Sequence, residues 1–298
     1  MKKLILLSFG LMLAFCVSAQ EFSAGYYSYL TNPFTINPAY TGSSKTMDGI
    51  LSVRSQQAGL QGAPRTALLG FHASINDMQG AGFRLKTDSR GAFQVLKFDA
   101  TYGHRARINK DNTLRFGVSG GVVNKQFNIN RINNHELLDQ TDPNLSSSYY
   151  RSTNAFFGAG LLFQGKDLEI GLASPHLLEN GSGLSSYVHA SASYKLQLNS
   201  NINLTPKVFY NNLPVVRKQA DFLAEADFRN LLMVMAGYRT NSTILAGFGA
   251  RVSGFRFRYV YEYNSSVMSS IAGSSHEFML EINLVSRKSL EGHDRSEP

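Results

Sequence analysis

The chain has 298 residues, of which 43% are hydrophobic and only 17% charged, with one cysteine and no tryptophan. This composition excludes a disordered chain, a coiled coil and a disulfide-rich scaffold. The formal charge is +8, but the basic residues are scattered along the chain, which argues against a nucleic-acid-binding surface. The mean hydropathy of −0.16 excludes a bundle of apolar membrane helices. A β-barrel stays possible, because only every second residue of its strands faces lipid.

Residues 1–19 have the pattern of a secretory signal peptide. A positive start and an apolar run precede small residues that suit cleavage between Ala19 and Gln20. Cys16 raises the alternative of a lipid-modified cysteine, but the bulky Phe15 before it is unlike the small residue found at lipidation sites. Cleavage after Ala19 leaves a mature chain without cysteine, which excludes thiol nucleophiles and cysteine metal ligands.

Beyond the signal peptide, apolar and polar residues alternate with period two, as they do in a β-strand with one apolar face. The pattern is clearest over 255–263, where Phe255, Phe257, Tyr259 and Tyr261 share one face and charged residues occupy most of the other. A soluble sandwich also alternates. Long strands of about ten residues and aromatic residues on several apolar faces are, however, typical of strands that cross the outer membrane.

We therefore predict an all-β fold, a single closed antiparallel transmembrane β-barrel of about fourteen strands of the outer-membrane type, over residues 46–285. Phe255, Phe257, Tyr259 and Tyr261 are predicted to form a lipid-facing girdle, which makes outer-membrane lipid one partner of the protein. The predicted strands are 47–57, 65–75, 80–87, 91–105, 112–124, 153–163, 167–173, 185–197, 201–210, 215–227, 230–239, 242–252, 255–263 and 273–284.

The connections between these strands alternate between short and longer ones. With an even number of strands both chain ends lie in the periplasm, so the long connections face outward. The longest one covers 126–152 and is rich in Asn, Ser and Tyr, which suits adaptable polar contact with a protein partner. Its candidate partner-binding residues are Asn133, Asn134, Asp142, Pro143, Tyr149 and Tyr150.

Residues that could carry chemistry are few. The sequence has no phosphate-binding loop, no HExxH and no GxSxG. His189, Ser191 and Ser193 share one face of a predicted strand and could suggest a hydrolase. Because no third group or oxyanion donor can be placed beside them, they fit polar residues of a barrel lumen better. We predict no catalytic residue, no metal ligand and no cofactor, and hence a protein that is not an enzyme.

Three acidic residues on one predicted strand are another candidate site. Asp221, Glu225 and Asp227 share a face and could bind a cation. Because polar groups inside a lumen need partners, we instead predict ion pairs with arginines of neighbouring strands. These predicted partners are Arg251, Arg256 and Arg258.

Two Asn-Pro pairs precede the first predicted strand and force extended or turn backbone there. This stretch contains Asn32, Pro33, Asn37, Pro38, Ala39, Tyr40 and Gly42. A second stretch follows the first strand and contains Arg54, Gly59 and Pro64. The two stretches resemble the signature of the PorP/SprF family of type IX secretion system membrane proteins, found in Bacteroidota. In that family a Trp is usual where this chain has Gln57.

The resemblance implies an outer-membrane barrel with one of two roles. Some members of the family belong to the secretion and gliding-motility machinery and associate with its periplasmic ring components. Others hold one secreted adhesin or cargo protein at the cell surface. We expect a non-enzymatic anchor for such a secreted protein. The alternatives are a core subunit of the machinery and, as a different class, a channel or hydrophobic-solute transporter.

Two further segments lie outside the predicted barrel. Residues 20–45 form the Asn-Pro-rich segment, which is rich in Tyr and Phe and is expected to pack in or under the barrel mouth. Because the predicted inward charges have both signs, we expect a lumen that is not an open pore. Residues 286–298 extend past the last strand and are expected to form a disordered periplasmic tail.

Overall fold

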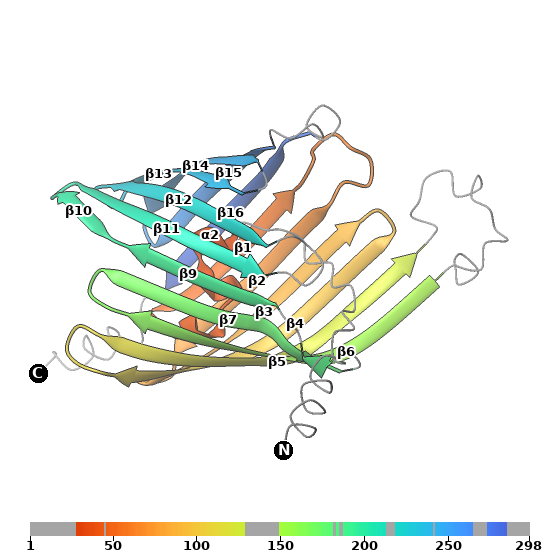
Figure 1. Ribbon diagram of the computed structural model, residues 1–298, viewed down its shortest axis with the longest axis horizontal. Helices are drawn as coiled ribbons and strands as arrows, with labels where there is room; N and C mark the ends of the chain where they lie inside the picture. The colour runs from red at the N-terminus through yellow and green to blue at the C-terminus, as the bar shows by residue number, and fades with distance from the viewer. Residues whose placement is uncertain are drawn as a thin grey trace, which may run out of the picture.

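The computed structural model describes residues 28–44, 46–128, 149–180, 183–184, 187–212, 218–240, 242–264 and 273–284. Almost all of them are strand or the turns between strands (Figure 1). The strands are β1 (Met47–Ser55), β2 (Arg65–Ser74), β3 (Gln79–Arg90), β4 (Phe93–Arg107), β5 (Thr113–Asn128), β6 (Tyr149–Gln164), β7 (Leu168–Glu179), β8 (Gly183–Leu184), β9 (Val188–Tyr194), β10 (Leu196–Asn199), β11 (Ile202–Asn212), β12 (Gln219–Phe228), β13 (Leu232–Arg239), β14 (Thr243–Val252), β15 (Phe255–Asn264) and β16 (Ser275–Leu284).

These strands form one closed antiparallel barrel with a wall of fourteen strands. Each strand pairs with its neighbour in sequence, and β1 closes the circle by pairing with β16, with Met47 opposite Leu284. Two short segments do not count as separate wall strands: β8 only extends the edge of β7, and β9 and β10 are two parts of one wall strand. The prediction of a closed antiparallel barrel of about fourteen strands is confirmed.

The interruption between β9 and β10 has a local cause in the facing strand. β9 pairs with β11 up to Ser193 opposite Lys207, and β10 resumes with Leu196 opposite Leu204. Pro206 lies in the gap, and proline has no N–H to donate to the ladder. Lys195 lies between β9 and β10, and its N–H donates toward β7, to the Asp167 carbonyl at 2.8 Å, next to the pairing of Tyr194 with Leu168.

The two ends of the barrel differ in their connections. One end, here called the short-turn end, carries tight turns such as those at 165–167 and 253–254, and the chain enters β1 and leaves β16 there. The opposite end, the long-loop end, carries the connections at 56–64, 129–148 and 265–274. Strands β4, β5 and β6 have 15, 16 and 16 residues, against 8 in β13, so the wall is highest beneath the connection at 129–148.

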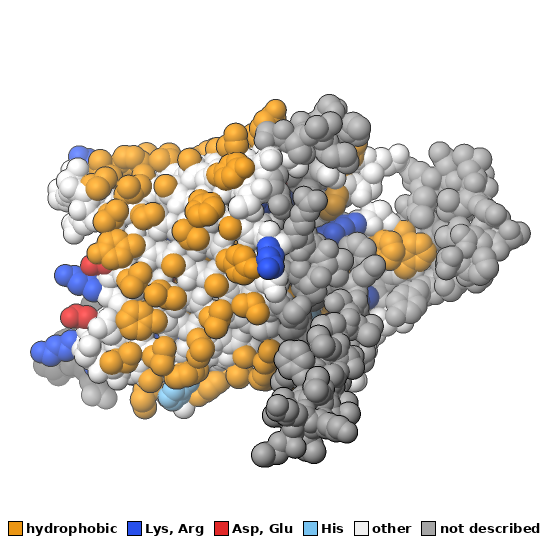
Figure 2. Space-filling model, viewed as in Figure 1, with side chains coloured by type: hydrophobic (Ala, Val, Ile, Leu, Met, Phe, Trp, Pro, Cys, Tyr) orange, Lys and Arg blue, Asp and Glu red, His pale blue; other side chains and the backbone are white. Residues whose placement is uncertain are grey.

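Apolar side chains cover the outer face of the wall, and charged groups gather at the short-turn end (Figure 2). Phe255 and Phe257 are 42% and 51% exposed on this face, and Tyr259 and Tyr261 lie half-buried on the same face. Alternate residues point inward, so Arg258 and Glu262 are buried. No part of the described chain covers these apolar side chains, so the outer face has the apolar surface that a membrane barrel turns to lipid. None of the helices among the described residues is long and apolar enough to cross a membrane.

Residues 28–44 lie inside the barrel and are here called the plug (Figure 1, red). The plug has no strand and consists of three short turns of helix: α2 (Ser28–Thr31), η1 (Pro33–Thr35) and η2 (Pro38–Tyr40). Leu30, Phe34, Ile36 and Ala39 are at most 1% exposed. The Asn-Pro-rich segment was expected to pack in or under the barrel mouth, and its described residues, 28–44, lie within the lumen itself.

Candidate functional site

The plug owes its compact shape to its two Asn-Pro pairs. Pro33 and Pro38 each occupy the first position of a 3-10 turn, where the fixed φ of proline suits the turn and its missing N–H costs nothing. The side chain of Asn37 accepts a hydrogen bond from the Ala39 N–H at 2.9 Å and so caps the second turn. The chain can therefore fold back on itself twice within the lumen.

The second half of the plug, residues 37–42, rests on a row of four glycines that crosses four neighbouring strands. Gly80 on β3 faces Gly103 on β4, Gly103 faces Gly117 on β5, and Gly117 faces Gly160 on β6. A Cβ atom at any of the four would overlap the plug: at Gly117 with Pro38 and Ala39, at Gly103 with the Thr41 carbonyl, at Gly160 with the Asn37 side chain, and at Gly80 with Gly42. The row, here called the glycine row, lets plug backbone and wall backbone touch directly.

Polar contacts fix the plug on the glycine row. Asn37 Nδ2 donates to the Leu161 carbonyl of β6 at 3.1 Å. Arg115 on β5, 2% exposed, donates from Nε to the Ala39 carbonyl at 3.1 Å and from a terminal nitrogen to the Thr41 carbonyl at 3.0 Å. These bonds satisfy backbone groups that the non-strand conformation leaves without partners inside the barrel.

Long charged side chains hold the first half of the plug, residues 28–36. Arg84 on β3 donates to the Phe34 carbonyl at 2.9 Å and to Asp99 on β4. Arg258 on β15 donates to the Thr31 carbonyl at 3.1 Å and to Glu281 on β16 at 2.7 Å. Each cation therefore bridges a wall carboxylate and a plug carbonyl, which balances the charge that the closed lumen would otherwise bury alone.

Tyr29 joins a polar cluster toward the long-loop end. Its hydroxyl donates to Asp221 Oδ2 at 2.5 Å and accepts from Arg239 at 3.2 Å. Asp221 is also paired with Arg239 through its other oxygen at 2.5 Å. Asn211 and Gln219 each donate an amide N–H to the same hydroxyl. The Tyr29 hydroxyl is thus hydrogen-bonded to residues of three wall strands, β11, β12 and β13.

The predicted ion pairs of the lumen were correct in kind but mostly wrong in partner. Asp221 pairs with Arg239 on the adjacent strand β13, where the register places them directly opposite. Asp227 lies at the short-turn end and accepts from the Asn230 N–H, closing a turn. Glu225 bonds Lys207 at 3.0 Å and has Arg258 at 3.7 Å, so this one predicted contact is present. Strand register, which decides the pairings, was not available from alternation alone.

The two signature stretches of the sequence lie in different environments. Gly42 has a φ of +64° and abuts Gly80, which explains the need for glycine at this plug position. Arg54 is buried on β1 and pairs with Glu262 at 2.6 Å. Gly59 has a φ of +100° in the β1–β2 connection, which the Pro64 carbonyl helps to close by accepting from the Gln56 N–H. The second stretch therefore shapes a connection at the long-loop end.

His189, Ser191 and Ser193, which the sequence favours as lumen residues over a hydrolase site, do not assemble a nucleophile and base. His189 is fully buried, its Nδ1 bonds Asn211 at 2.8 Å, and its ring packs against Tyr29. Ser191 and Ser193 lie on the same inward face but line a pocket farther toward the short-turn end. Within the described ranges, no three His, Cys, Asp or Glu side chains gather where they could hold a metal ion.

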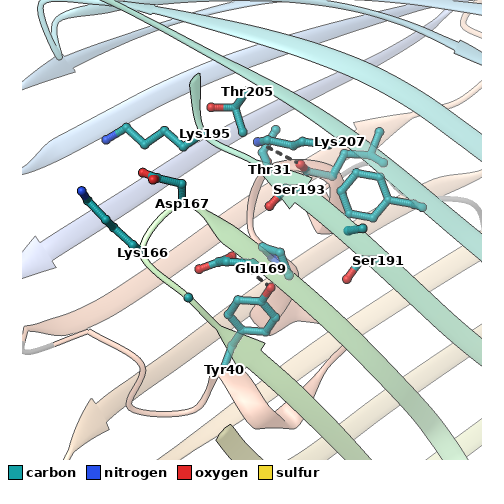
Figure 3. Close-up of a pocket in the computed structure, with 15 residues that line it drawn as sticks. Thr31, Tyr40, Lys166, Asp167, Glu169, Ser191, Ser193, Lys195, Thr205 and Lys207 are labelled. Carbon is teal, nitrogen blue, oxygen red and sulfur yellow. Dashed lines mark hydrogen bonds between the residues drawn. The ribbon is translucent and has the colours of Figure 1, made fainter. Parts of the chain in front are cut away.

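Two pockets flank the plug at the short-turn end. The larger, of about 270 Å³, lies between the plug and strands β7, β9 and β11 (Figure 3). The smaller, of about 170 Å³, lies between the plug and strands β1, β15 and β16. Tyr40 borders both, and its hydroxyl donates to Glu169 at 3.3 Å. Burial raises the pKa of Tyr40 well above its ordinary value, and the Glu169 carboxylate adds to the shift, so the phenol stays protonated.

Several predicted residues lie outside the described part of the chain. These are the cleavage-site residues Ala19 and Gln20, the loop residues Asn133, Asn134, Asp142 and Pro143, and the tail 286–298. The backbone of Tyr149 and Tyr150 forms the first two residues of β6. The candidate partner-binding loop and the signal cleavage thus stay predictions.

Sequence reasoning missed the glycine row, although a signal for it was present. Gly103 and Gly117 both fall at inward positions of strands whose alternation was recognised. Several predicted strands carry glycines at inward positions, and the chain has a non-strand segment that must pack somewhere. Together these features could have indicated that the segment contacts the wall backbone directly.

Comparison with known proteins agrees with the barrel geometry. The structure is similar to CymD, a monoaromatic hydrocarbon channel, with a TM-score of 0.51 and 12% identity over 89% of this chain and 94% of that one. It is also similar to a FadL homologue of Pseudomonas aeruginosa, with a TM-score of 0.50 and 12% identity over 83% of this chain and 92% of that one. At such low identity these similarities concern the fold alone.

The sequence comparison identifies the family. No curated protein matches the sequence. The profile described as type IX secretion system membrane protein PorP/SprF, however, matches residues 18–282, which include the plug and every strand up to the end of β16 except its last two residues. A closed outer-membrane β-barrel filled by its own Asn-Pro-rich segment is therefore the form that this sequence takes, and the chain belongs to the PorP/SprF family of type IX secretion system membrane proteins.

Proposed function

We propose that this protein is a non-conducting outer-membrane platform that anchors a secreted adhesin or other type IX cargo protein at the cell surface. The filled lumen is the observation that carries the proposal. The plug touches wall backbone along the glycine row and is bonded to β3, β5 and β15 through Arg84, Arg115 and Arg258. A barrel closed in this way is suited to holding a partner in the membrane plane rather than to passing solute.

The raised wall at the long-loop end supports an outward binding face. The outward side chains near the end of β5, Asn124, Gln126 and Asn128, are polar, whereas Phe116, Val118 and Val122 below them are apolar and exposed. This change from apolar to polar indicates that β5 continues past the hydrocarbon layer. The wall would then present the Asn- and Ser-rich connection at 129–148 to a secreted protein.

A core subunit of the secretion and gliding machinery is the alternative within the same system. Such a subunit would associate with periplasmic ring components through the short-turn end. Loss of an anchor should release one adhesin into the medium and leave other type IX cargo unaffected, whereas loss of a core subunit should block export of all cargo. Comparing the secreted proteins of deletion and parent cells separates the two roles.

A channel or hydrophobic-solute transporter is the candidate from a different class. It is favoured by the fold similarity to a protein named as a monoaromatic hydrocarbon channel and by the two pockets beside the plug. In a transporter the plug would have to move aside to let solute pass. Such a movement would expose Leu30, Phe34, Ile36 and Ala39, which are buried in this structure.

Affinity purification of the tagged barrel from native outer membranes, followed by mass spectrometry, tests the proposal most broadly. Recovery of one large secreted protein supports the anchor. Recovery of only periplasmic ring components moves the assignment to the machinery, and recovery of neither favours the transporter. A barrel with the connection 129–148 replaced by a short Gly-Ser turn is the matched control, since it should lose the secreted protein but keep its place in the membrane.

A further inference from the structure

The larger pocket at the short-turn end has an excess of hydrogen-bond donors without partners. The hydroxyls of Ser191, Ser193 and Thr205 line it, and none of them has a hydrogen-bond partner among the described residues. Lys166 and Lys195 line its mouth, are exposed, and form no ion pair with another described residue. Figure 3 shows the Asp167 carboxylate between these two lysine side chains. The mouth therefore carries two free cations against one carboxylate.

The other charged groups of the pocket are already satisfied. Glu169 accepts from the Tyr40 hydroxyl at 3.3 Å and from Gln164 at 2.9 Å. Lys207 pairs with Glu225 at 3.0 Å and approaches the Leu30 carbonyl at 3.5 Å. An incoming group would thus meet only free donors and the one Asp167 carboxylate. This pattern suits an acceptor-rich group of low negative charge, because Asp167 opposes a multiply charged anion.

The remaining walls are apolar and the space is small. Leu30 and Pro33 of the plug and the Phe209 ring on β11 contribute the apolar lining. The volume of about 270 Å³ lies just below the range of roughly 300–1,000 Å³ typical of pockets for whole small-molecule ligands. The pocket therefore fits the end of a chain with a polar head and a short apolar stem.

The mouth lies where an interruption of the wall meets a turn. The pairing of β9 and β10 with β11 is interrupted beside Pro206, and on the other side of the strand the Lys195 N–H donates to the Asp167 carbonyl of the β6–β7 turn. The same turn carries Lys166. The two free lysines are thus brought together by backbone geometry at the end of the barrel that faces the periplasm.

We propose that this pocket binds the C-terminal carboxylate of a polypeptide on the periplasmic side. The carboxylate would lie at the mouth beside Lys166 and Lys195, and the last residue would contact the hydroxyls and the apolar wall. Capture of a chain terminus is a known mode of peptide recognition. The site is separate from the proposed cargo-binding end, so it does not depend on the proposed anchoring function. A periplasmic partner protein would supply this chain terminus.

Titration calorimetry on the purified full chain in detergent tests the site. The probes are acetyl-Gly-Ser-Leu with a free carboxylate, its C-terminal amide, and inorganic phosphate. We expect the free acid to bind about tenfold more tightly than the amide, because the amide has no negative charge to pair with the two lysines. The K166Q/K195Q double variant should lose this preference. The matched control is Lys110→Gln, an exposed lysine on the β4–β5 turn, which should leave the preference unchanged.

The proposal is overturned if the protein does not distinguish acid from amide, if the preference survives in the double lysine variant, or if phosphate displaces the peptide at equal concentration.

Discussion

The two halves of the plug are held by different physical means. Residues 37–42 touch the wall backbone itself, because the glycine row removes every side chain that would lie between them. Residues 28–36 meet side chains of the wall instead. Leu30 and Ile36 lie in an apolar cluster with wall residues, and Arg84 and Arg258 donate to plug carbonyls. Direct backbone contact therefore positions the second half, whereas side-chain packing and charged hydrogen bonds position the first. The comparison teaches that one lumen can be closed by two kinds of contact, one through glycines and one through large side chains.

The largest expected effect comes from filling the glycine row. In Gly117→Val the new side chain would overlap backbone atoms of Pro38 and Ala39, which no rotamer change can relieve. We expect a loss of about 5 kcal/mol of unfolding free energy or displacement of the plug. Urea unfolding followed by electrophoretic mobility of the folded barrel measures it. Gly120→Val on the same strand is the control, since nothing lies within 4 Å of its Cβ position. Equal effects of both variants would remove the glycine row from the explanation.

Breaking an ion pair of the first half should cost less. Arg84→Met leaves the Asp99 carboxylate, 2% exposed, without its cation and the Phe34 carbonyl without its donor. We expect a loss of about 3–5 kcal/mol. Replacing both partners with apolar residues in R84M/D99L should recover much of it, because no charge is then buried alone. If the double variant is as unstable as Arg84→Met, the charge argument is wrong and the Arg84–Phe34 bond dominates.

A change on the outer face separates the stability of the barrel from that of the plug. Phe257→Arg places a cation where the side chain is 51% exposed on the lipid-facing surface. We expect a loss of about 2–4 kcal/mol if this position lies near the bilayer midplane. Phe257→Leu keeps the surface apolar and should fold like the parent. Refolding into vesicles reports the difference, and insertion of Phe257→Arg with unchanged stability would place Phe257 away from lipid.

The smallest effect is expected within the plug. Asn37→Ala removes the cap on the Ala39 N–H and the bond to the Leu161 carbonyl, while the glycine row stays intact. We expect a loss of about 1–2 kcal/mol. Asn32→Ala is the matched comparison, because the Asn32 side chain makes no capping bond to its turn. A larger loss for Asn32→Ala than for Asn37→Ala would contradict the role given to the cap.

The fold was predictable because its signals are local. Alternation assigned the inward and outward faces of strands such as β15, and an even strand count followed from counting them. The pairing of Asp221 with Arg239 was not predictable, because it depends on register between strands, which one sequence does not fix. The glycine row was hidden for the same reason. Its members are far apart in sequence, and only the ladder pairing brings Gly80, Gly103, Gly117 and Gly160 side by side.

Single-channel recording in planar bilayers tests most directly whether the plug closes the lumen. The purified full chain should give no steady conductance above the bilayer baseline, because residues 28–44 fill the lumen between the glycine row and the arginine bridges. Gly117→Val should open a conductance that Gly120→Val does not. A large, steady conductance in the parent protein would contradict the closed platform and favour a channel.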